Sequence, residues 1–372
     1  MKIAIYEHVT ASGNIYSPTW VEGDAILKAS IEDIKAAGHE VYVIDSIPPK
    51  KPVDLVIVIA PSSGRMIYSL VKACEDEGLN VVNSPSSAIF LASDKALLTR
   101  NLQLHDIKTP RTIISSFDEG FRSIERALMA YGKVVVKPAD GDGCIGLSVV
   151  THPDEISLAL RKVKQHSKLP YFIVQEFIDG ISVSVNLLSS GNVIVPLSVN
   201  LQNVSLKSPT EHSSYLGNVV PYEENRDLVI STALKTIKSL GYVKGFFGVD
   251  MILKNHELYV VEVNPRLTTS YLALREISSS NILEMTIKAY FNELISEPLQ
   301  LNGVAIIEKM IADKDMFIRP SDLKIPSDAK LLSTIADKKP IIKRGEAYAI
   351  YVVKKPVINQ NHGFSESKAL EQ

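Results

Sequence analysis

The chain has 372 residues, and 40 lysines and arginines against 42 aspartates and glutamates leave a net charge of −2. This balance lacks the basic excess of a nucleic-acid-binding protein. Its two cysteines, Cys74 and Cys144, are too few for a disulfide framework or a thiolate zinc cluster. The N-terminus lacks a signal-peptide pattern, and no apolar run approaches the roughly 18 residues of a membrane span. We therefore expect a cytoplasmic protein of two or three domains that binds neither nucleic acid nor membrane.

The first 92 residues alternate between strand and helix signals. Between the expected strands, apolar residues recur at helical spacing and stop at Gly38 and Gly78. The expected strands are residues 3–6, 41–44, 54–59 and 81–82. Ser84 and Pro85 are typical of an N-cap followed by proline at the first helical position. This order predicts a doubly wound α/β domain whose ligand groups lie at the carboxyl ends of its strands.

The pattern changes after about residue 104. The next segment predicts a small α+β lid with two helices against a few antiparallel strands, and a strand-rich segment interrupted by one long helix follows it. Strands at 303–311 and 346–353 indicate a small C-terminal β unit, and a polar tail, expected to be loose, ends the chain. The expected units are residues 1–92, 93–180, 181–300, 301–356 and the tail 357–372.

A glycine-rich loop follows the expected strand at 134–137. Gly141, Gly143 and Gly146 match the G-x-G-x-x-G pattern, but the residues after them indicate a strand, whereas a dinucleotide fingerprint requires a helix there. A strand–glycine–strand hairpin of this kind can fold over phosphates, with Lys137 just before it. An ordinary glycine-rich turn beside a solvated Lys137 explains the loop alone equally well.

A second group of residues indicates a metal site. Asp250 lies inside an apolar strand, and Glu262 and Asn264, two residues apart on the next strand, share one face of the expected hairpin. Two carboxylates and an amide oxygen form a hard oxygen site that suits magnesium. Arg266 follows this strand and is able to bind anionic oxygens with two donors, although a surface salt bridge is the alternative.

A third segment, residues 173–185, combines an apolar strand with a turn at Asp179. Its backbone groups are suited to the edge of an adenine ring, and Asp179, Ser182 or Glu176 would then face the ribose. A plain β-turn between two strands explains Asp179 equally well. The adenine-facing residues would be Gln175, Glu176, Phe177 and Ile178.

The order of these motifs resembles the ATP-grasp ligases across roughly residues 1–295. A lysine, Lys95, precedes the glycine loop, and Q-E-F-I, G-V-D and E-V-N-P-R follow it in turn. The resemblance implies an ATP-grasp fold of the α/β and α+β classes. It also implies an N-terminal pre-ATP-grasp domain, a lid subdomain, a subdomain with the metal site and a C-terminal β-rich part. The implied cofactors are ATP and Mg²⁺ or Mn²⁺, with two ions expected.

The resemblance also implies roles for single residues. Lys95 and Lys137 would contact the nucleotide phosphates, while the loop around Asp142 closes over them. Arg266 and Lys137 would neutralise charge on the transferred phosphoryl group. The implied metal ligands are Asp250, Glu262 and Asn264. In this chemistry a carboxylate attacks ATP to form an acyl phosphate and ADP, and an amine then displaces phosphate to leave an amide.

Finer strings, among them E-V-N-P-R-L-T-T-S-Y, resemble an archaeal branch of the family. That branch contains the tyramine–glutamate ligase of methanofuran biosynthesis, which implies a small carboxylate and a small amine as substrates. The implied substrate contacts are Glu7, Thr10, Ser12, Glu22, Lys207, Tyr215, Thr268 and Thr269. Three alternatives stay open: a D-alanine-ligase-like enzyme, a biotin-carboxylase-like enzyme and an ATP-binding regulator without catalysis. The oligomeric state is open too, with a homodimer among the options.

Overall fold

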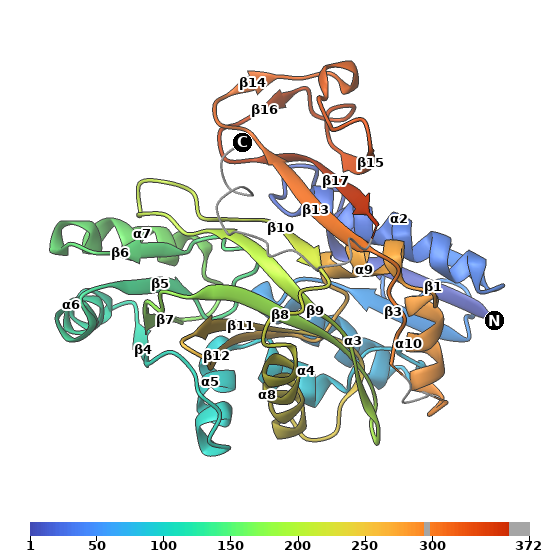
Figure 1. The fold of residues 1–372 in the computed structure, drawn as a ribbon, viewed down its shortest axis with the longest axis horizontal. Helices are drawn as coiled ribbons and strands as arrows, with labels where there is room; N and C mark the ends of the chain where they lie inside the picture. Colours follow the sequence, from blue (N-terminus) through green and yellow to red (C-terminus); the bar gives the residue numbers. More distant parts are fainter. Residues whose placement is uncertain (294–297, 357–372) are drawn as a thin grey trace.

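The structure is a computed structural model that describes residues 1–293 and 298–356. Three main sheets form its frame: a parallel sheet of three strands, an antiparallel sheet of four and an antiparallel sheet of eight (Figure 1). The tail expected at 357–372 lies outside the described residues. No helix in the described ranges is long and apolar enough to cross a membrane.

The N-terminal α/β layer has the strand order β2-β1-β3, and all three strands run parallel. All five residues of β3 are buried, as expected for a strand that is covered on both faces. The strands are β1 (Lys2–Glu7), β2 (Glu40–Val43) and β3 (Leu55–Ile59), and the helices are α1 (His8–Ala11), α2 (Trp20–Ala36), α3 (Met66–Asp76) and α4 (Ser86–Ala92).

Two local predictions in this layer are wrong. Val81 forms only an isolated parallel bridge to Val56, so no fourth strand develops. Pro85 is itself the N-cap of α4, which places Ser84 outside the helix. The Ser84 hydroxyl instead donates a 2.7 Å hydrogen bond to the carbonyl oxygen of Lys244 and accepts one from the Lys244 amide, so it links this layer to the large sheet.

The predicted small α+β lid is confirmed. Its four strands pair antiparallel in the order β4-β7-β5-β6, and its two helices share one apolar core with them. The amphipathic pattern explains this packing, because Ile124 and Val163, both fully buried, lie on the helix faces that meet the sheet. The elements are β4 (Thr112–Ser116), α6 (Gly120–Tyr131), β5 (Val134–Pro138), β6 (Ser148–Val150), α7 (Ile156–His166) and β7 (Tyr171–Glu176).

The large sheet has the strand order β12-β11-β8-β9-β10-β13-β17-β15, and every neighbouring pair is antiparallel. The predicted C-terminal strands are thus part of the central sheet. The strands are β8 (Ile181–Ser190), β9 (Ile194–Ser205), β10 (Ser214–Val220), β11 (Lys244–Lys254), β12 (Glu257–Asn264), β13 (Val304–Ile311), β15 (Ala329–Thr334) and β17 (Ala347–Lys355). A separate ribbon pairs β14 (Met316–Phe317) with β16 (Ile341–Ile342).

Helices cover both faces of this sheet because its strands alternate apolar residues between the two faces. Leu188 and Phe246 face one core with α2, α9 and α10, while Leu187 and Phe247 face the other with α4, α5 and α8. The added helices are α5 (Lys95–Leu104), α8 (Arg226–Ser239), α9 (Thr269–Ile277) and α10 (Ile282–Tyr290).

We expect Gly217→Ala to destabilise the protein by about 3 kcal/mol. Gly217 has φ of 143°, and a Cβ there would overlap the backbone oxygen of Ile307, where β10 meets β13. The measurement is the free energy of unfolding in urea. Gly132→Ala is the control, because Gly132 also has positive φ but open space around it. It should cost only about 1 kcal/mol, and equal losses in both variants would contradict the clash.

Candidate active site

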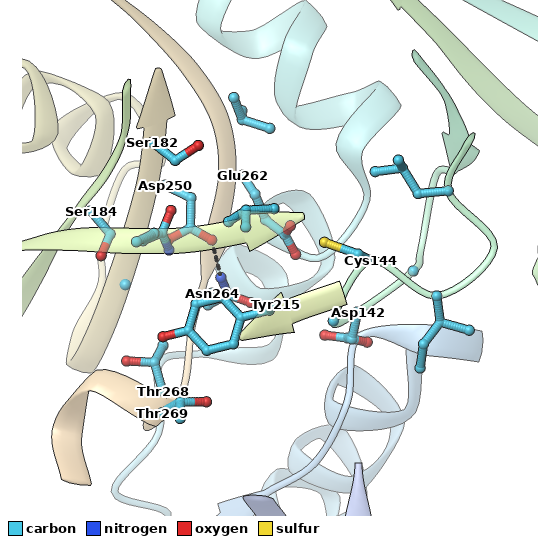
Figure 2. A pocket seen from close by; sticks show the side chains of 18 of the residues that line it. Asp142, Cys144, Ser182, Ser184, Tyr215, Asp250, Glu262, Asn264, Thr268 and Thr269 are labelled. Atoms are coloured by element: carbon cyan, nitrogen blue, oxygen red, sulfur yellow. Dashed lines mark hydrogen bonds between the residues drawn. The ribbon is translucent and has the colours of Figure 1, made fainter. Parts of the chain in front are cut away.

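A cavity of about 260 Å³ lies where the N-terminal layer, the lid and the large sheet meet. Its walls include the carboxyl end of β1, the start of α5, the loop between β5 and β6, and the β11–β12 hairpin. Figure 2 shows the side chains of Asp250, Glu262 and Asn264 gathered on one side of it, with Asp142 and Cys144 on the other. Elements far apart in the sequence therefore supply one site, in which charged side chains lie among apolar ones.

The β11–β12 hairpin places Asp250 directly opposite Glu262. Asn264, two residues further along β12, donates a 3.2 Å hydrogen bond to Asp250 Oδ2, and Gln202 donates one of 3.0 Å to Oδ1. Burial raises the pKa of Asp250, and the nearby Glu262 carboxylate adds to the shift. The hairpin thus collects oxygen atoms whose negative charge is costly unless a cation is close.

Lys95 occupies the first position of α5 because Asp94 caps that helix, accepting hydrogen bonds from the amides of Ala96 and Leu97. The Lys95 ammonium contacts Glu262 Oε1 at 3.0 Å and also donates to the carbonyl oxygen of Gly141. Burial alone would lower the pKa of Lys95, but the carboxylates of Glu262, Asp142 and Asp140 together outweigh it, and the pKa is raised. Lys95 therefore carries a permanent positive charge into the cavity.

Lys137 lies on β5 and is only 6% exposed. Burial, helped by the charge of Lys95, lowers the pKa of Lys137 to about 8. A lysine with this pKa is still mostly protonated at neutral pH, and an anion bound beside it would raise its pKa again. The two lysines approach the cavity from different elements and repel each other until such an anion is present.

The glycine-rich loop is folded down over the site. Asp142 Oδ1 accepts a 2.9 Å hydrogen bond from Arg266, and its Oδ2 accepts one of 3.0 Å from the amide of Ser63. Asp140 accepts a 2.7 Å bond from the amide of Gly64. The loop thus contacts both the N-terminal layer and the large sheet. Within the described residues, Arg266 Nε is a buried donor that has no hydrogen-bond partner.

Two glycines of the loop, Gly141 and Gly143, line the cavity, whereas Gly146 does not. A Cβ at Gly146 would lie 2.6 Å from that of His166, so this glycine permits close packing against α7. Cys144 does line the cavity, and burial raises the pKa of its thiol to about 11. The thiol is therefore protonated at neutral pH and is a poor nucleophile.

The segment at the end of β7 forms a second wall. Its lining residues are Gln175, Glu176, Phe177, Ile178 and Ser182. Apolar side chains complete this part of the cavity: Val135, Met251, Ile252 and Val261. Asp179, one of the three residues predicted to face a ribose, is exposed and lies outside the cavity lining. The reason is local, because Asp179 forms the outward turn between β7 and β8.

Five of the eight predicted substrate contacts line the far end of the cavity: Glu7, Glu22, Tyr215, Thr268 and Thr269. The other three, Thr10, Ser12 and Lys207, do not line it. Ser12 is exposed and donates to the carbonyl of Val9 in its own turn. Lys207 lies in the connection between β9 and β10. Its backbone carbonyl accepts a hydrogen bond from the Val149 amide, and its side chain is exposed. Thr10 lines a separate groove beside β2.

Polar residues on β8 and β9 also line the cavity, and no role was predicted for them from the sequence. Ser184, Asn186 and Gln202 line the cavity, and Gln202 binds Asp250 directly. The sequence signal for the residues on β8 is the alternation of polar and apolar side chains. Ser182, Ser184 and Asn186 lie on one face of a strand whose other face is apolar. In the described ranges, no group of three or more histidine, cysteine or acidic residues could hold a metal. A cation here would therefore rely on two carboxylates and on neutral oxygen donors.

Glu7 reaches the cavity because a glycine faces it. Its carboxylate caps α1 by accepting hydrogen bonds from the amides of Val9 and Thr10. A Cβ at Gly23 would lie 2.7 Å from Glu7 Oε1, so only a glycine leaves this space free. Glu7 is 3% exposed, which places a carboxylate at the buried end of the site.

Comparisons with known proteins agree with this geometry. Residues 92–270 match the model of the ATP-grasp domain. The tyramine–L-glutamate ligase of Methanocaldococcus fervens is 28% identical over 251 residues, which cover 67% of this chain and 70% of that protein. The D-alanine–D-alanine ligase of Carboxydothermus hydrogenoformans is 31% identical over 276 residues, or 67% of this chain and 84% of that protein.

A solved structure extends the match to almost the whole chain. An ATP-grasp superfamily protein from Archaeoglobus fulgidus has a TM-score of 0.62 at 20% identity, and the match covers 95% of this chain and 99% of that one. The family match at 92–270 and the 31% identity confirm the resemblance that the E-V-N-P-R motif first indicated. The chain belongs to the ATP-grasp family and is an ATP-dependent ligase of that family.

Proposed function

We propose that this ligase activates the carboxyl group of an amino acid and joins it to a small amine, with glutamate and tyramine as the leading pair. The observation that carries the proposal is the cavity itself, in which Lys95, Lys137 and Arg266 face the Asp250–Glu262 carboxylate pair. Cations and carboxylates that line the same cavity suit a nucleoside triphosphate and its metal ion. The amino-acid part rests on the charged far end of the cavity.

In this proposal the adenine lies between the end of β7 and the apolar side chains of Val135 and Met251. Main-chain groups of residues 175–178 then meet the edge of the ring, and Ser182 lies where a ribose hydroxyl would be. Lys95 and Lys137 take the phosphates. The lowered pKa of Lys137 supports this role, because an adjacent phosphate would offset the repulsion from Lys95.

ATP-grasp enzymes use Mg²⁺, and the residues present fit such an ion. Asp250, Glu262 and Asn264 offer hard oxygen donors of the kind Mg²⁺ prefers. The raised pKa of Asp250 supports the assignment, because a bound cation would relieve the cost of its buried charge. When bound, the ion would neutralise charge on the phosphate oxygens. We propose that Lys95 keeps Glu262 aimed into the site through their 3.0 Å contact.

The chemistry depends on positioning. The substrate carboxylate attacks the terminal phosphorus of ATP, the bond to the bridging oxygen breaks, and ADP leaves. The amine then attacks the acyl carbon, phosphate departs and an amide remains. Arg266, with its buried and unpartnered Nε, is placed to stabilise the transferred phosphoryl oxygens. The closed glycine loop excludes water, which would otherwise hydrolyse the acyl phosphate.

A second candidate is a D-alanine-ligase-like enzyme, which would share the ATP chemistry and differ in its acceptor. The 31% identity to a D-alanine–D-alanine ligase favours it. A regulator that has lost catalysis is a weaker candidate, since the chain keeps both lysines, the arginine and the carboxylate pair around one cavity.

A hydroxylamine-trapping screen over carboxylic acids tests the function. With ATP and Mg²⁺, we expect hydroxamate to form with L-glutamate, because hydroxylamine captures the acyl phosphate whatever the natural amine is. Tyramine in place of hydroxylamine should then give an amide and one ADP per amide. D-Alanine as the preferred acid would favour the second candidate. Tight ATP binding without ADP release on any acid would contradict the ligase proposal.

Glu262→Gln should lower turnover about 100-fold or more, the scale seen when one electrostatic contact to a transition state is removed. The fold should survive, because the amide oxygen still accepts a hydrogen bond from Lys95. The measurement is ADP release with a thermal-melting control. Glu346→Gln is the matched variant, since Glu346 forms a comparable 2.6 Å ion pair with Lys339 outside the cavity lining. Wild-type turnover in Glu262→Gln would overturn the metal assignment.

ATP affinity should fall as the pH rises above about 8, where free Lys137 loses its proton. Between pH 7 and 9.5 we expect a loss of about tenfold in the association constant, because only the protonated side chain attracts phosphate. Calorimetric titration with a non-hydrolysable ATP analogue at fixed Mg²⁺ measures this loss. In Lys137→Arg the guanidinium keeps its charge, so the curve should flatten. The same slope in both proteins would count against the role of Lys137.

A further inference from the structure

Lys309 is a buried lysine on strand β13. This strand lies outside residues 92–270, which match the ATP-grasp domain. Its side chain is only 6% exposed. The ammonium lies 3.2 Å from Glu22 Oε1 and 5.2 Å from the centroid of the Tyr215 ring. Lysine is rarely buried to this extent without a specific partner.

Several side chains near the Lys309 ammonium line the active-site cavity, although Lys309 itself is not among the lining residues. Glu22 and Tyr215 are part of its far end, and Thr269, which donates a 3.0 Å hydrogen bond to the same Glu22 oxygen, lies there too. Among the charged groups around Cys144, Lys309 has the largest effect on the pKa of the thiol, after burial itself. The ammonium is therefore held next to the cavity, at the end away from the β7 segment.

The Lys309 ammonium has more donor capacity than its surroundings use. It carries three N–H groups, and among the described residues Glu22 is its one ion-pair partner. Glu22 Oε1 is already shared with Thr269. The face of the Tyr215 ring attracts the charge without accepting a full hydrogen bond. An anionic group in the cavity would satisfy the remaining donors at little cost, because the ammonium is already desolvated.

We propose that Lys309 receives a second anionic group of the acid substrate, the carboxylate that is not phosphorylated. This inference rests on the proposed function and narrows it. The acid substrate would then be a dianion, and an amino dicarboxylic acid is the simplest case. One of its carboxylates would bind near Arg266 and the other would bind Lys309. Glu22, opposite in charge and adjacent, would face the ammonium group of such an acid. The C-terminal strands then contribute a specificity residue as well as sheet structure.

The first test uses the wild-type enzyme in hydroxamate screens of matched acids: L-glutamate against 4-aminobutyrate, and L-aspartate against β-alanine. Each pair differs by the second carboxylate. We expect the dianionic member to be preferred by at least tenfold in kcat/KM. A preferred acid with one carboxylate and no other anion would overturn the inference while leaving the ligase proposal intact. No hydroxamate with any acid would overturn both.

The second test uses Lys309→Met, which keeps the length of the side chain and removes its charge. We expect KM for the preferred acid to rise at least tenfold, KM for ATP to stay unchanged, and the preference within each pair to collapse. Lys309→Arg should restore part of it. Lys339→Met breaks the matched Lys339–Glu346 pair outside the cavity lining and should leave the preference intact.

A structural ion pair alone would give a different result. Lys309→Met would then melt at a lower temperature, because Glu22 is left buried and unpaired, but it would keep the wild-type preference between paired acids. That outcome overturns the inference. If Lys309→Met does not fold, Lys309→Gln replaces it, and the wild-type pairs of the first test still decide.

Discussion

The site depends on the pairing of buried charges at the junction of three sheets. Lys95 enters from α5 and meets Glu262 from β12, while Asp142 from the lid loop meets Arg266 just beyond β12. A buried charge without a partner costs several kcal/mol, so each element must hold its neighbour in place. The closed loop, the aligned hairpin and the docked N-terminal layer are consequences of this one requirement.

The antiparallel sheet gives this charge cluster a rigid floor. In the β11–β12 hairpin, opposite residues share a face, so Asp250 and Glu262 must both point into the cavity while Val249 and Val263 point into the core behind it. A one-residue slip would bury the carboxylates in that core. The position of the carboxylates is thus coupled to the packing of the whole sheet.

The carboxyl ends of the strands in the N-terminal layer form the opposite wall of the cavity. Glu7 ends β1 and caps the short helix that follows, which aims its carboxylate at the cavity. The contact with Gly23 on α2 is possible only because that residue has no side chain. The lid loop closes this frame, because Asp140 and Asp142 accept hydrogen bonds from backbone amides of the N-terminal layer.

Much of the fold could be predicted because short-range patterns of apolar and polar residues determine it. The lid, the strands at 303–311 and 346–353 and the shared face of Glu262 and Asn264 follow from alternation and helical spacing. Ser84 and Val81 were placed wrongly because single turn residues and two-residue strands carry weak local signals. Ser12 and Lys207 lie outside the cavity lining for a related reason, since both lie in connections whose direction only packing sets.

The amino-acid sequence by itself determined which functional groups are present. It fixes which carboxylates, lysines and glycines occur and which of them share a strand face. The period of a strand is a local property, so these statements need no knowledge of the rest of the chain. Only the tertiary structure decided that β13 joins β10, and so that Lys309 stands beside Glu22 from a helix 287 residues earlier (309 − 22). Such a contact arises from the order in which strands pair, and no local spacing encodes that order.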